Sequence, residues 1–359
     1  MKTVTINASK TYDIKIASNL LDTIGREIQS LGRVSKVCVV SDSNVFPLYG
    51  QRIRDSLEAV GLQVHEFVFP AGESSKNAGT FISLLNHLAQ MHLTRTDMIV
   101  ALGGGVVGDL AGFAASCYLR GIRFVQVPTT LLAAVDSSVG GKTAIDLDAG
   151  KNLAGAFYQP SLVICDINTL QTLSADVFRD GCAEVIKYAV LYDPDLFNLL
   201  ASHGLNFDRE EVITRCVKWK QQVVMEDEFD TDSRMKLNLG HTIGHGVEAK
   251  SDFAISHGMA VAIGMAIVSR SAAASGYCSQ ECCEQIIGLL HLFGLPVTTE
   301  YTSQDLYAFT LSDKKRSGGS VGLIVPKEIG FCEVLPTPIE ELKSFIQAGL
   351  SYGSHYSAR

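Results

Sequence analysis

Short runs of β-branched and other apolar residues alternate with longer, helix-like stretches between about residues 36 and 166. The runs cover residues 36–41, 64–69, 98–102, 124–127 and 162–165. Strands that are separated by helices are typical of a parallel sheet with helices covering it. A charged, alternating run at residues 1–7 is a further candidate strand. We therefore predict an α/β domain with a parallel sheet over residues 1–172.

A polar or glycine-rich turn follows the first four of these runs. The turns are Asp42-Ser43-Asn44, Gly72-Glu73-Ser74-Ser75-Lys76, Gly103-Gly104-Gly105 and Thr129-Thr130. The carboxyl ends of parallel strands meet at one edge of the sheet, which is where such sheets usually bind ligands. The turns therefore predict one ligand-binding cleft.

The strand pattern fades after about residue 173. Segments near 181–191, 209–226, 238–249, 257–274 and 279–292 have the length and the 3.6-residue spacing of helices. A late pair of strands is expected at residues 321–325 and 331–335. We therefore predict a second, mainly α-helical domain over residues 173–359.

Composition and charge narrow the class of protein. Hydrophobic residues make up 47% of the 359 residues and charged residues only 19%, against about 25% in an average protein, so the chain can bury a large core. The formal net charge of −8 opposes general attraction to nucleic acid. The nine cysteines include no Cys-x-x-Cys pair, which suits free thiols in a reducing cytoplasm.

The most apolar region, residues 254–274, is interrupted by polar side chains such as His257 and Arg270. A membrane-spanning helix needs about 18 apolar residues without such interruptions, so we interpret this region as a buried helix. The first residues do not have the pattern of a secretory signal. We therefore expect a cytoplasmic protein that binds neither membranes nor nucleic acid.

A glycine turn opens the candidate helix after residue 102. Backbone N–H groups and the positive helix end at Gly103-Gly104-Gly105 suit a pyrophosphate, although a plain strand-to-helix turn has the same pattern. Asp42, after an earlier strand, adds an acceptor for a ribose hydroxyl. Together these features favour a nucleotide site.

The sequence Gly140-Gly141-Lys142-Thr143 ends like the phosphate loop of an NTPase. The first glycine of that motif is missing, because Asp136 stands in its place, so a Walker-type NTPase is disfavoured. Lys142, Lys151 and Asn152 lie among glycines, which suits an anionic ligand but is also compatible with solvated surface side chains.

A candidate metal site can be assembled from the second half of the chain. Glu184 and Lys187 share one helix face, and so do His241 and His245. With His257, one carboxylate and two or three imidazoles could meet at a catalytic zinc ion, although single histidines are often structural. A zinc peptidase is disfavoured because no glutamate follows His241.

Several cations accompany these motifs in an acidic chain. They are Arg120, Lys220, Arg234 and the run Lys314-Lys315-Arg316, whose alternative interpretation is an exposed loop. Arginine and lysine bind phosphate and carboxylate, so the set indicates a substrate with two or more negative groups.

Taken together, the motifs resemble the 3-dehydroquinate synthases, from about Asp42 to Lys315. The most specific segments are Arg120-Gly121-Ile122, Pro128-Thr129-Thr130-Leu131-Leu132, residues 135–143, Gly150-Lys151-Asn152-Leu153, Gln159-Pro160, Ala183-Glu184-Val185-Ile186-Lys187-Tyr188, Asn238-Leu239-Gly240-His241-Thr242-Ile243-Gly244-His245 and Ser256-His257-Gly258. The sequence departs from the family pattern at Asp230, where glutamate is usual, and at Ala134, where glutamine is common.

This resemblance implies a Rossmann-like NAD domain and a helical metal domain, with the active site between them in a homodimer. NAD would be held by Asp42, Asn44, Glu73, Lys76, Gly104, Gly105, Val106, Asp109, Thr129, Thr130, Lys142, Lys151 and the turn from Thr169 to Thr172. Zn²⁺ or Co²⁺ would be held by Glu184, His241 and His257. Substrate would meet Asp136, Lys142, Lys151, Asn152, Lys187, Lys220, Arg234, Asn238, His245 and one of Lys314 and Lys315, with Arg120 reaching over from the partner subunit.

The reaction implied by the resemblance turns 3-deoxy-D-arabino-heptulosonate 7-phosphate into 3-dehydroquinate and phosphate. It combines a transient oxidation by NAD, β-elimination of phosphate, re-reduction, ring opening and an intramolecular aldol closure. Three alternatives stay open: another sugar phosphate cyclase, a metal-dependent polyol dehydrogenase, and a nucleotide-binding protein without activity. The first two would share the metal domain, and the dehydrogenase would accumulate NADH.

Overall fold

The computed structural model describes residues 1–231, 233–314 and 319–352, and the side chains of residues 310–314 lie outside this description. The chain divides into two compact units. The first comprises Met1–Ser174 and Arg209–Phe229, and the second comprises Ala175–Asp208 and Asp230–Arg359. The sequence pattern divides the chain once, at residues 172/173. The structure, by contrast, packs helix α7 (Arg209–Glu226) against strand β1 of the first unit.

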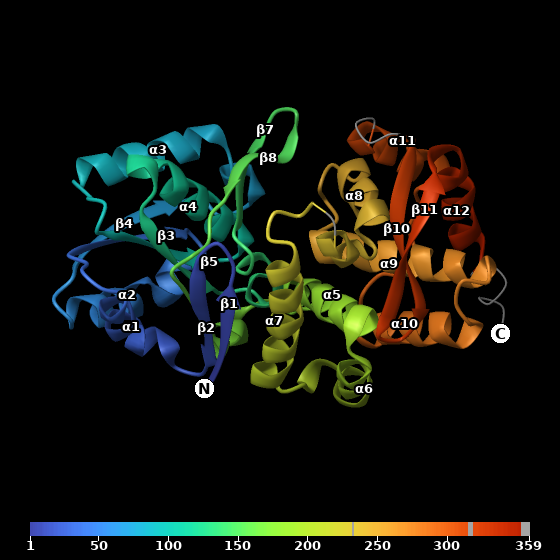
Figure 1. The fold of residues 1–359 in the computed structure, drawn as a ribbon, viewed down its shortest axis with the longest axis horizontal. Coiled ribbons are helices and arrows are strands. Elements are labelled where there is room, and N and C mark those ends of the chain that lie inside the picture. The colour runs from blue at the N-terminus through green and yellow to red at the C-terminus, as the bar shows by residue number, and fades with distance from the viewer. Residues whose placement is uncertain (232, 315–318, 353–359) are drawn as a thin grey trace. The chain divides into compact units, whose positions relative to one another are not determined.

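A seven-stranded sheet forms the centre of the first unit (Figure 1). In spatial order its strands are β1 (Lys2–Asn7), β2 (Thr11–Ala17), β9 (Leu162–Asp166), β6 (Arg123–Pro128), β5 (Met98–Gly103), β3 (Lys36–Asp42) and β4 (Gln63–Phe69). β1 and β2 form an antiparallel hairpin, and all other neighbouring strands of this sheet run parallel. The predicted parallel sheet is therefore confirmed, and β2 is a strand that the sequence pattern did not predict.

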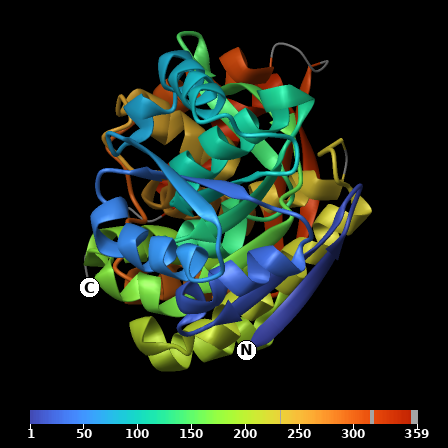
Figure 2. The same cartoon turned by 90° about the vertical axis from the view of Figure 1, so that its left-hand side faces the viewer.

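Helices cover both faces of this sheet (Figures 1 and 2). They are α1 (Ile24–Ser30), α2 (Phe46–Glu58), α3 (Ala78–Gln90) and α4 (Gly105–Cys117). Val37 and Val39 of β3 share a core with α1 and α2. Cys38 and Val40 share the opposite core with α3 and α4. Because side chains alternate along a strand, one continuous apolar run supplies both cores.

A two-stranded hairpin in the first unit is absent from the sequence-based prediction. β7 (Lys142–Leu147) and β8 (Gly150–Phe157) pair antiparallel in the segment that resembles a phosphate loop. Gly155 allows the close pairing, since a Cβ there would lie 2.1 Å from the carbonyl oxygen of Thr143. The glycines and lysines of this segment hide the alternation by which strands are recognised, and Lys142 begins a strand rather than a helix.

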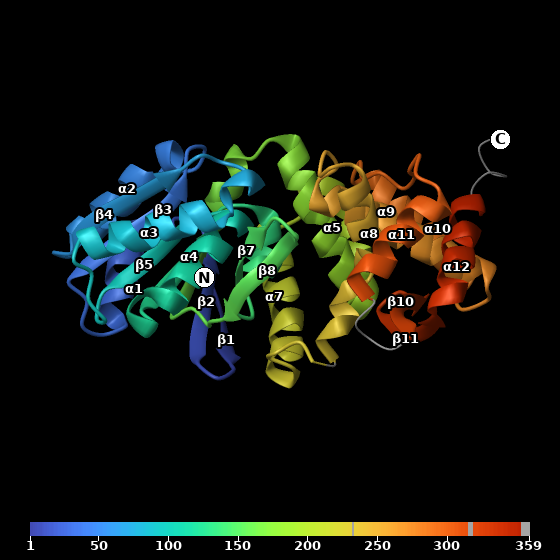
Figure 3. The same cartoon turned by 90° about the horizontal axis from the view of Figure 1, so that it is seen from above.

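The second unit is mainly helical, as predicted (Figure 3). Its helices are α5 (Ala175–Tyr192), α6 (Pro194–His203), α8 (His241–Lys250), α9 (His257–Ala274), α10 (Gln280–Leu292), α11 (Ser303–Lys314) and α12 (Ile339–Ser351). Strands β10 (Ser320–Glu328) and β11 (Phe331–Pro338) form the predicted late pair and pack beside α9 and α12. Of the helices in the described ranges, α9 alone is long and apolar enough to cross a membrane, and 72% of it is buried within the protein. It is the expected core helix.

Helix α9 begins in very close contact with α5. The Asp180 carboxylate accepts hydrogen bonds from the Ser256 hydroxyl at 2.5 Å and from the Met259 backbone N–H at 3.1 Å. A Cβ on Gly258 would lie only 1.9 Å from the carbonyl oxygen of Asp180. The position of His257, between Ser256 and Gly258, is therefore fixed relative to α5.

Gly258→Ala should lower the free energy of unfolding by about 1–3 kcal/mol, the usual cost of overpacking. Urea unfolding followed by circular dichroism measures this change. Gly288→Ala in α10 is the matched control, because nothing lies within 4 Å of a Cβ there and alanine favours a helix over glycine by about 1 kcal/mol. A Gly258→Ala variant as stable as the unaltered protein would contradict the close contact between α5 and α9.

Candidate functional site

The polar turns after β3, β4, β5 and β6 lie along one edge of the sheet. β3 ends at Asp42, which pairs with Phe69 at the end of β4. β5 ends at Gly103, which pairs with Pro128 at the end of β6, just before Thr129. β3 and β5 are neighbours in the sheet but are not consecutive in the chain. The strand order therefore reverses here, and such a reversal is where open α/β sheets bind ligands.

The glycine turn joins β5 to α4 and places Gly104 at the N-cap of that helix. Its glycines are needed for packing. A Cβ on Gly103 would lie 2.4 Å from the Val107 side chain, and one on Gly105 would lie 3.2 Å from the Ser137 hydroxyl. Gly104, Gly105 and Val106 are half-buried, and the N–H groups of the first helical turn suit an anionic group.

Local hydrogen bonds hold the residues beside these turns that are predicted to bind the nucleotide. One carboxylate oxygen of Asp42 accepts from the backbone N–H groups of Asn44 at 2.8 Å and Val45 at 2.9 Å, which fixes the start of α2. The Thr129 N–H donates to Gly103 at 3.0 Å, and the Thr130 hydroxyl accepts from the Ala133 N–H at 3.2 Å.

The turn from Thr169 to Thr172 is fastened to α2. The Tyr49 hydroxyl donates to the carbonyl oxygen of Thr169 at 3.1 Å and lies 2.5 Å from the hydroxyl of Thr172. Thr169 is buried. A sequence pattern does not show this contact, because Tyr49 lies on a distant helix.

Lys76 is the centre of a buried polar network. Its ammonium group lies 2.8 Å from Asp109, 3.5 Å from Glu73 and in contact with the side-chain oxygen of Asn152, while only 4% of the side chain is exposed. Burial would lower the pKa of Lys76, but the charges of Asp109 and Glu73 raise it above its usual value. The network therefore links the turn after β4, helix α4 and the β7–β8 hairpin.

Asp146 joins this network, although the sequence did not single it out. Its N–H donates to the carbonyl oxygen of Lys76 at 2.7 Å, and its carboxylate accepts from the Asn152 N–H at 2.8 Å. Asn152 has a φ of +56°, which this contact supports. Burial raises the pKa of the Asp109 carboxyl to about 6, although Lys76 acts in the opposite direction.

Asp136 and Lys220 form a second polar pair within the first unit. The Lys220 ammonium group lies 2.7 Å from the Asp136 carboxylate and 2.6 Å from its carbonyl oxygen. Lys220 is buried. Helix α7 carries this lysine from the later part of the sequence to the sheet domain.

The remaining predicted cations of the first unit are more exposed. Lys142 is exposed at the start of β7, and Lys151 is half-buried at the start of β8. Arg120 is exposed and has a φ of +66° in the turn after α4.

Glu184, His241 and His257 come together in the second unit from three different helices. Their candidate ligand atoms all lie within 4.8 Å of one another. The Glu184 carboxylate is 3.4 Å from Nε2 of His241 and 3.6 Å from Nε2 of His257, and Glu184 is fully buried. The structure thus brings the predicted metal ligands together, and their role as ligands stays a prediction.

The outer ring nitrogens of both histidines have acceptors. Nδ1 of His241 lies 3.1 Å from the carbonyl oxygen of Leu239, and Nδ1 of His257 lies 3.2 Å from the Glu248 carboxylate. With the proton on Nδ1, the lone pair on Nε2 is directed toward Glu184. One oxygen and two nitrogen donors fit a divalent ion such as Zn²⁺.

The two imidazoles differ in protonation when no ion is bound. Burial, together with the charge of Lys187, lowers the pKa of His241 to about 3. Burial also acts to lower the pKa of His257, but its hydrogen bonds with Glu184 and Glu248 raise it to about 10. A divalent ion would replace the proton on His257.

Other predicted substrate residues surround this cluster. Lys187, one turn after Glu184 on α5, contacts the Glu184 carboxylate and is only 1% exposed. The His245 ring lies 5.6 Å from that of His241 and 6.1 Å from that of His257, and His245 is exposed.

Arg234 and Asn238 lie on the 3₁₀ segment Ser233–Asn238 of the second unit, with Arg234 buried and Asn238 exposed. The Lys314 side chain and Lys315 lie outside the described residues. Asp230, the first departure from the family pattern, is exposed with a φ of +57°. Ala134, the second, is buried.

Glu248 is a site residue that the sequence reasoning missed. It lies on α8 seven residues after His241 and three after His245, so the three side chains share one helix face. The spacing could have revealed it, whereas its contact with His257 depends on the packing of α8 against α9.

Family models match most of the chain. The 3-dehydroquinate synthase N-terminal model covers residues 66–180, and the C-terminal model covers residues 181–316. The 3-dehydroquinate synthase of Enterococcus faecalis is 42% identical, covering 96% of this chain and 98% of its own. That of Pelobacter propionicus is 46% identical, covering 95% and 98%.

Solved structures agree with this fold. A 2-deoxy-scyllo-inosose synthase complexed with carbaglucose-6-phosphate, NAD⁺ and Co²⁺ has a TM-score of 0.88 at 26% identity, covering 97% of this chain and 100% of its own. A 2-epi-5-epi-valiolone synthase from Streptomyces hygroscopicus with NAD⁺ and Zn²⁺ bound has a TM-score of 0.87 at 27% identity, covering 98% and 99%. A Schizosaccharomyces pombe glycerol dehydrogenase, at 16% identity and a TM-score of 0.66, covers 98% and 93% and shares the fold alone.

His241→Ala should abolish tight Zn²⁺ binding, because it removes one nitrogen of the Glu184, His241 and His257 set. His245→Ala should keep the ion and serves as the control, because His245 lies on the same helix outside that set. Chelator competition on the purified proteins measures both affinities. Equal loss in the two variants would contradict the assignment of His241 as a ligand in preference to His245.

Proposed function

Because the chain belongs to the 3-dehydroquinate synthase family, we propose that it converts 3-deoxy-D-arabino-heptulosonate 7-phosphate to 3-dehydroquinate and phosphate. The observation that carries this proposal is 42–46% identity with curated 3-dehydroquinate synthases over 94–96% of the chain. The 2-deoxy-scyllo-inosose and 2-epi-5-epi-valiolone synthases share the fold at only 25–27% identity. This difference favours the heptulosonate as the substrate.

The residues fit NAD and a divalent ion, Zn²⁺ or Co²⁺. The strand turns and the start of α4 would hold NAD, and Glu184, His241 and His257 would hold the ion. When bound, NAD takes up and returns a hydride, and the ion acts as a Lewis acid on substrate oxygens. We keep as a proposal the functional division expected from the sequence, with residues 1–172 binding NAD and 173–359 binding metal and substrate, apart from α7. α7 is the segment that adds Lys220 to the first unit.

Cationic side chains would bind and orient the negative groups of the substrate. Lys142, Lys151 and Arg234 stabilise the phosphate and carboxylate charges, and Asn152 adds an amide. Asp136 keeps the Lys220 ammonium group in place. Phosphate leaves by β-elimination with its own oxygen as the base, so the chain needs no separate base for this step. The leaving phosphate carries the negative charge, which the cations stabilise.

The later steps would use residues of the second unit. His245 is exposed and transfers a proton during ring opening and closure. Lys187, which is buried against Glu184, stabilises the enolate formed before the aldol closure. Asn238 and one of Lys314 and Lys315 complete the substrate contacts.

The proposed function also includes the oligomeric state of the enzyme and its location in the cell. We expect a homodimer in which Arg120 of each protomer reaches the partner's site. The enzyme would act in the cytoplasm on a phosphorylated sugar acid.

The proposed activity predicts phosphate release in many-fold excess over the NAD supplied, because each hydride is returned. A coupled assay with the heptulosonate phosphate, Zn²⁺ and substoichiometric NAD measures phosphate while absorbance follows NADH. We expect no NADH accumulation and loss of activity on chelation. Steady NADH formation from a polyol would instead identify a dehydrogenase. If neither phosphate nor NADH formed while NAD was still bound, the remaining interpretations would be another sugar phosphate cyclase or a nucleotide-binding protein without activity.

Lys187→Ala should lower kcat at least about 100-fold, as expected for loss of a group that acts on charge in the transition state. Substrate binding and metal content are measured beside turnover, because Lys187 contacts Glu184. Lys250→Ala is the control, since this exposed lysine on α8 pairs with Asp305 away from the ligand set. Near-normal turnover of Lys187→Ala would contradict the assigned role.

A further inference from the structure

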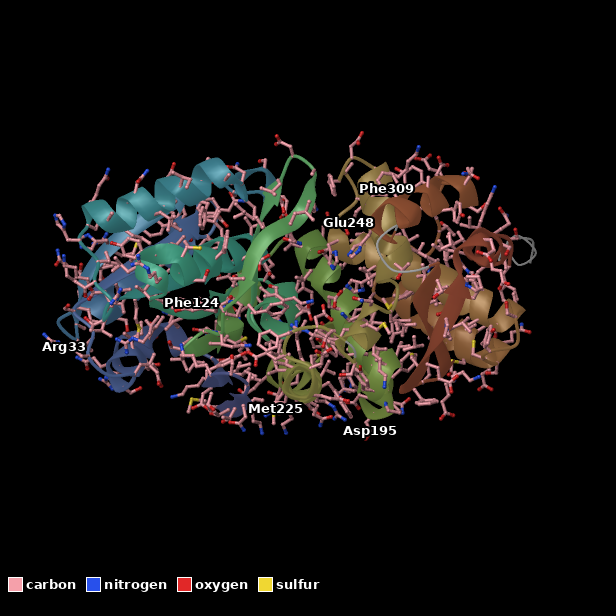
Figure 4. The ribbon with its side chains drawn as sticks, turned by 45° about the horizontal axis from the view of Figure 1, so that its top comes forward. Arg33, Phe124, Asp195, Met225, Glu248 and Phe309 are labelled. Carbon is pink, nitrogen blue, oxygen red and sulfur yellow. The ribbon has the colours of Figure 1, made fainter. Side chains whose placement is uncertain are left out.

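A second carboxylate lies behind the candidate metal ligands of the second unit. Glu248 is on α8 (Figure 4), and only 6% of the residue is exposed. Its Oε2 atom is 3.2 Å from Nδ1 of His257, on the first turn of α9. A buried carboxylate needs a charged or hydrogen-bonding partner, and the His257 ring supplies one.

The His257 ring lies between two carboxylates. Nδ1 faces Glu248, and Nε2 is 3.6 Å from Glu184. A neutral imidazole has one N–H and one lone pair. If Nδ1 donates its proton to Glu248, the lone pair is on Nε2, on the side of Glu184. The contact with Glu248 therefore selects the tautomer that can bind an ion at the proposed site.

The two histidines of the ligand set are supported by acceptors of different strength. His241 faces a neutral acceptor, the carbonyl oxygen of Leu239. His257 faces a carboxylate. A hydrogen bond to a charged acceptor is about twice as strong as one to a neutral acceptor, and it increases the basicity of the metal-binding nitrogen. His257 is thus the more strongly supported of the two rings.

The backbone keeps Glu248 and His257 at this distance. Helices α8 and α9 touch through glycines: a Cβ on Gly264 would lie 2.0 Å from the carbonyl oxygen of Gly240, and one on Gly244 would lie 2.9 Å from that of Ala260. The end of α8 is closed by the Phe253 N–H, which donates to the Glu248 carbonyl oxygen at 2.9 Å.

A second ion between His245, Glu248 and His257 is the competing interpretation, because their ligand atoms also lie within 4.8 Å of one another. This group shares His257 with the first set. One neutral imidazole cannot offer a lone pair to two ions at once, so the chemistry favours an outer-sphere role for Glu248.

We infer that Glu248 is a positioning residue that holds Nε2 of His257 toward the metal site and strengthens its bond to the ion. This inference rests on the ligand set given under the proposed function. It assigns no contact between Glu248 and the ion or the substrate.

Glu248→Gln tests the inference because it keeps the shape of the side chain and removes its charge. We expect the dissociation constant for Zn²⁺ to rise roughly 10–100-fold, the usual effect of losing such a partner. Chelator competition on the full chain measures it, without substrate or NAD. Glu281→Gln is the matched control: it removes the same charge from an exposed position on α10 of the same unit, and should change the affinity less than twofold.

Two further measurements separate positioning from general stability. The metal-free Glu248→Gln protein should still unfold cooperatively in urea, with a midpoint shift too small to account for the lost Zn²⁺ affinity, because Glu248 also faces the protonated His257 ring when no ion is bound. The visible absorption of bound Co²⁺ should change in Glu248→Gln and stay unchanged in Glu281→Gln, because it reports the ligand geometry.

Tight Zn²⁺ binding by Glu248→Gln, equal to that of the unaltered chain, would overturn the inference and leave the proposed function intact. A variant that does not fold, or that loses metal-free stability in proportion to its affinity, would also overturn it in favour of a structural role. Absence of Zn²⁺ binding in the unaltered chain would overturn the ligand set itself.

Discussion

The buried charge of Glu184 is the constraint on which the second unit depends. Its carboxylate has no exposed surface, and an uncompensated ion in such a place costs several kcal/mol. Without a bound ion, compensation comes from the Lys187 ammonium group on the same helix and from the protonated His257 ring on another. Helices that bring small polar rings so close to one carboxylate must themselves be close, and this explains why glycine stands at Gly258 and Gly264. The polar cluster around Glu184 therefore requires the glycine contacts that let its helices approach one another.

The first unit positions its ligand-binding edge mainly through the backbone. Its ligand edge is made of backbone turns whose positions follow from the sheet register, and few side chains there carry the geometry. Lys76 is one of these few, since it ties the turn after β4 to α4 and to the β7–β8 hairpin. Phosphate groups and ribose hydroxyls are recognised well by such fixed dipoles, whereas a metal ion needs converging side chains. The two units thus position their proposed ligands by different means.

The fold was largely predictable, because strong local patterns decide it. The β-branched runs of β3 and β5 are apolar on both faces, so they indicate a covered parallel sheet without any tertiary information. The β7–β8 hairpin was not predictable, since Gly155 and its neighbours lack strand propensity and the pairing depends on a close backbone contact. Helix α7 has a clear helical pattern, but its packing with β1 leaves no trace in local spacing.

The candidate site, too, has a part that local spacing predicts and a part that only tertiary contacts show. The pair His241 and His245 is visible as a helical spacing, yet spacing alone does not tell which of them faces Glu184. The resemblance to a family assigned His241, and not His245, as the metal ligand. The structure places Nε2 of His241 3.4 Å from the Glu184 carboxylate. Lys220 beside Asp136, and Glu248 beside His257, are contacts between distant segments, which single residues do not reveal.

The shared face of His241, His245 and Glu248 on α8 limits how the sequence of this segment can evolve. His241, His245 and Glu248 are aligned only because the intervening residues advance the helix by fixed steps of about 100° each. Replacing an intervening side chain leaves this phase intact, but inserting or deleting one residue would turn Glu248 away from the face that His241 occupies. The number of residues in this stretch is therefore constrained in addition to the identity of those, such as Gly244, whose small size the packing requires.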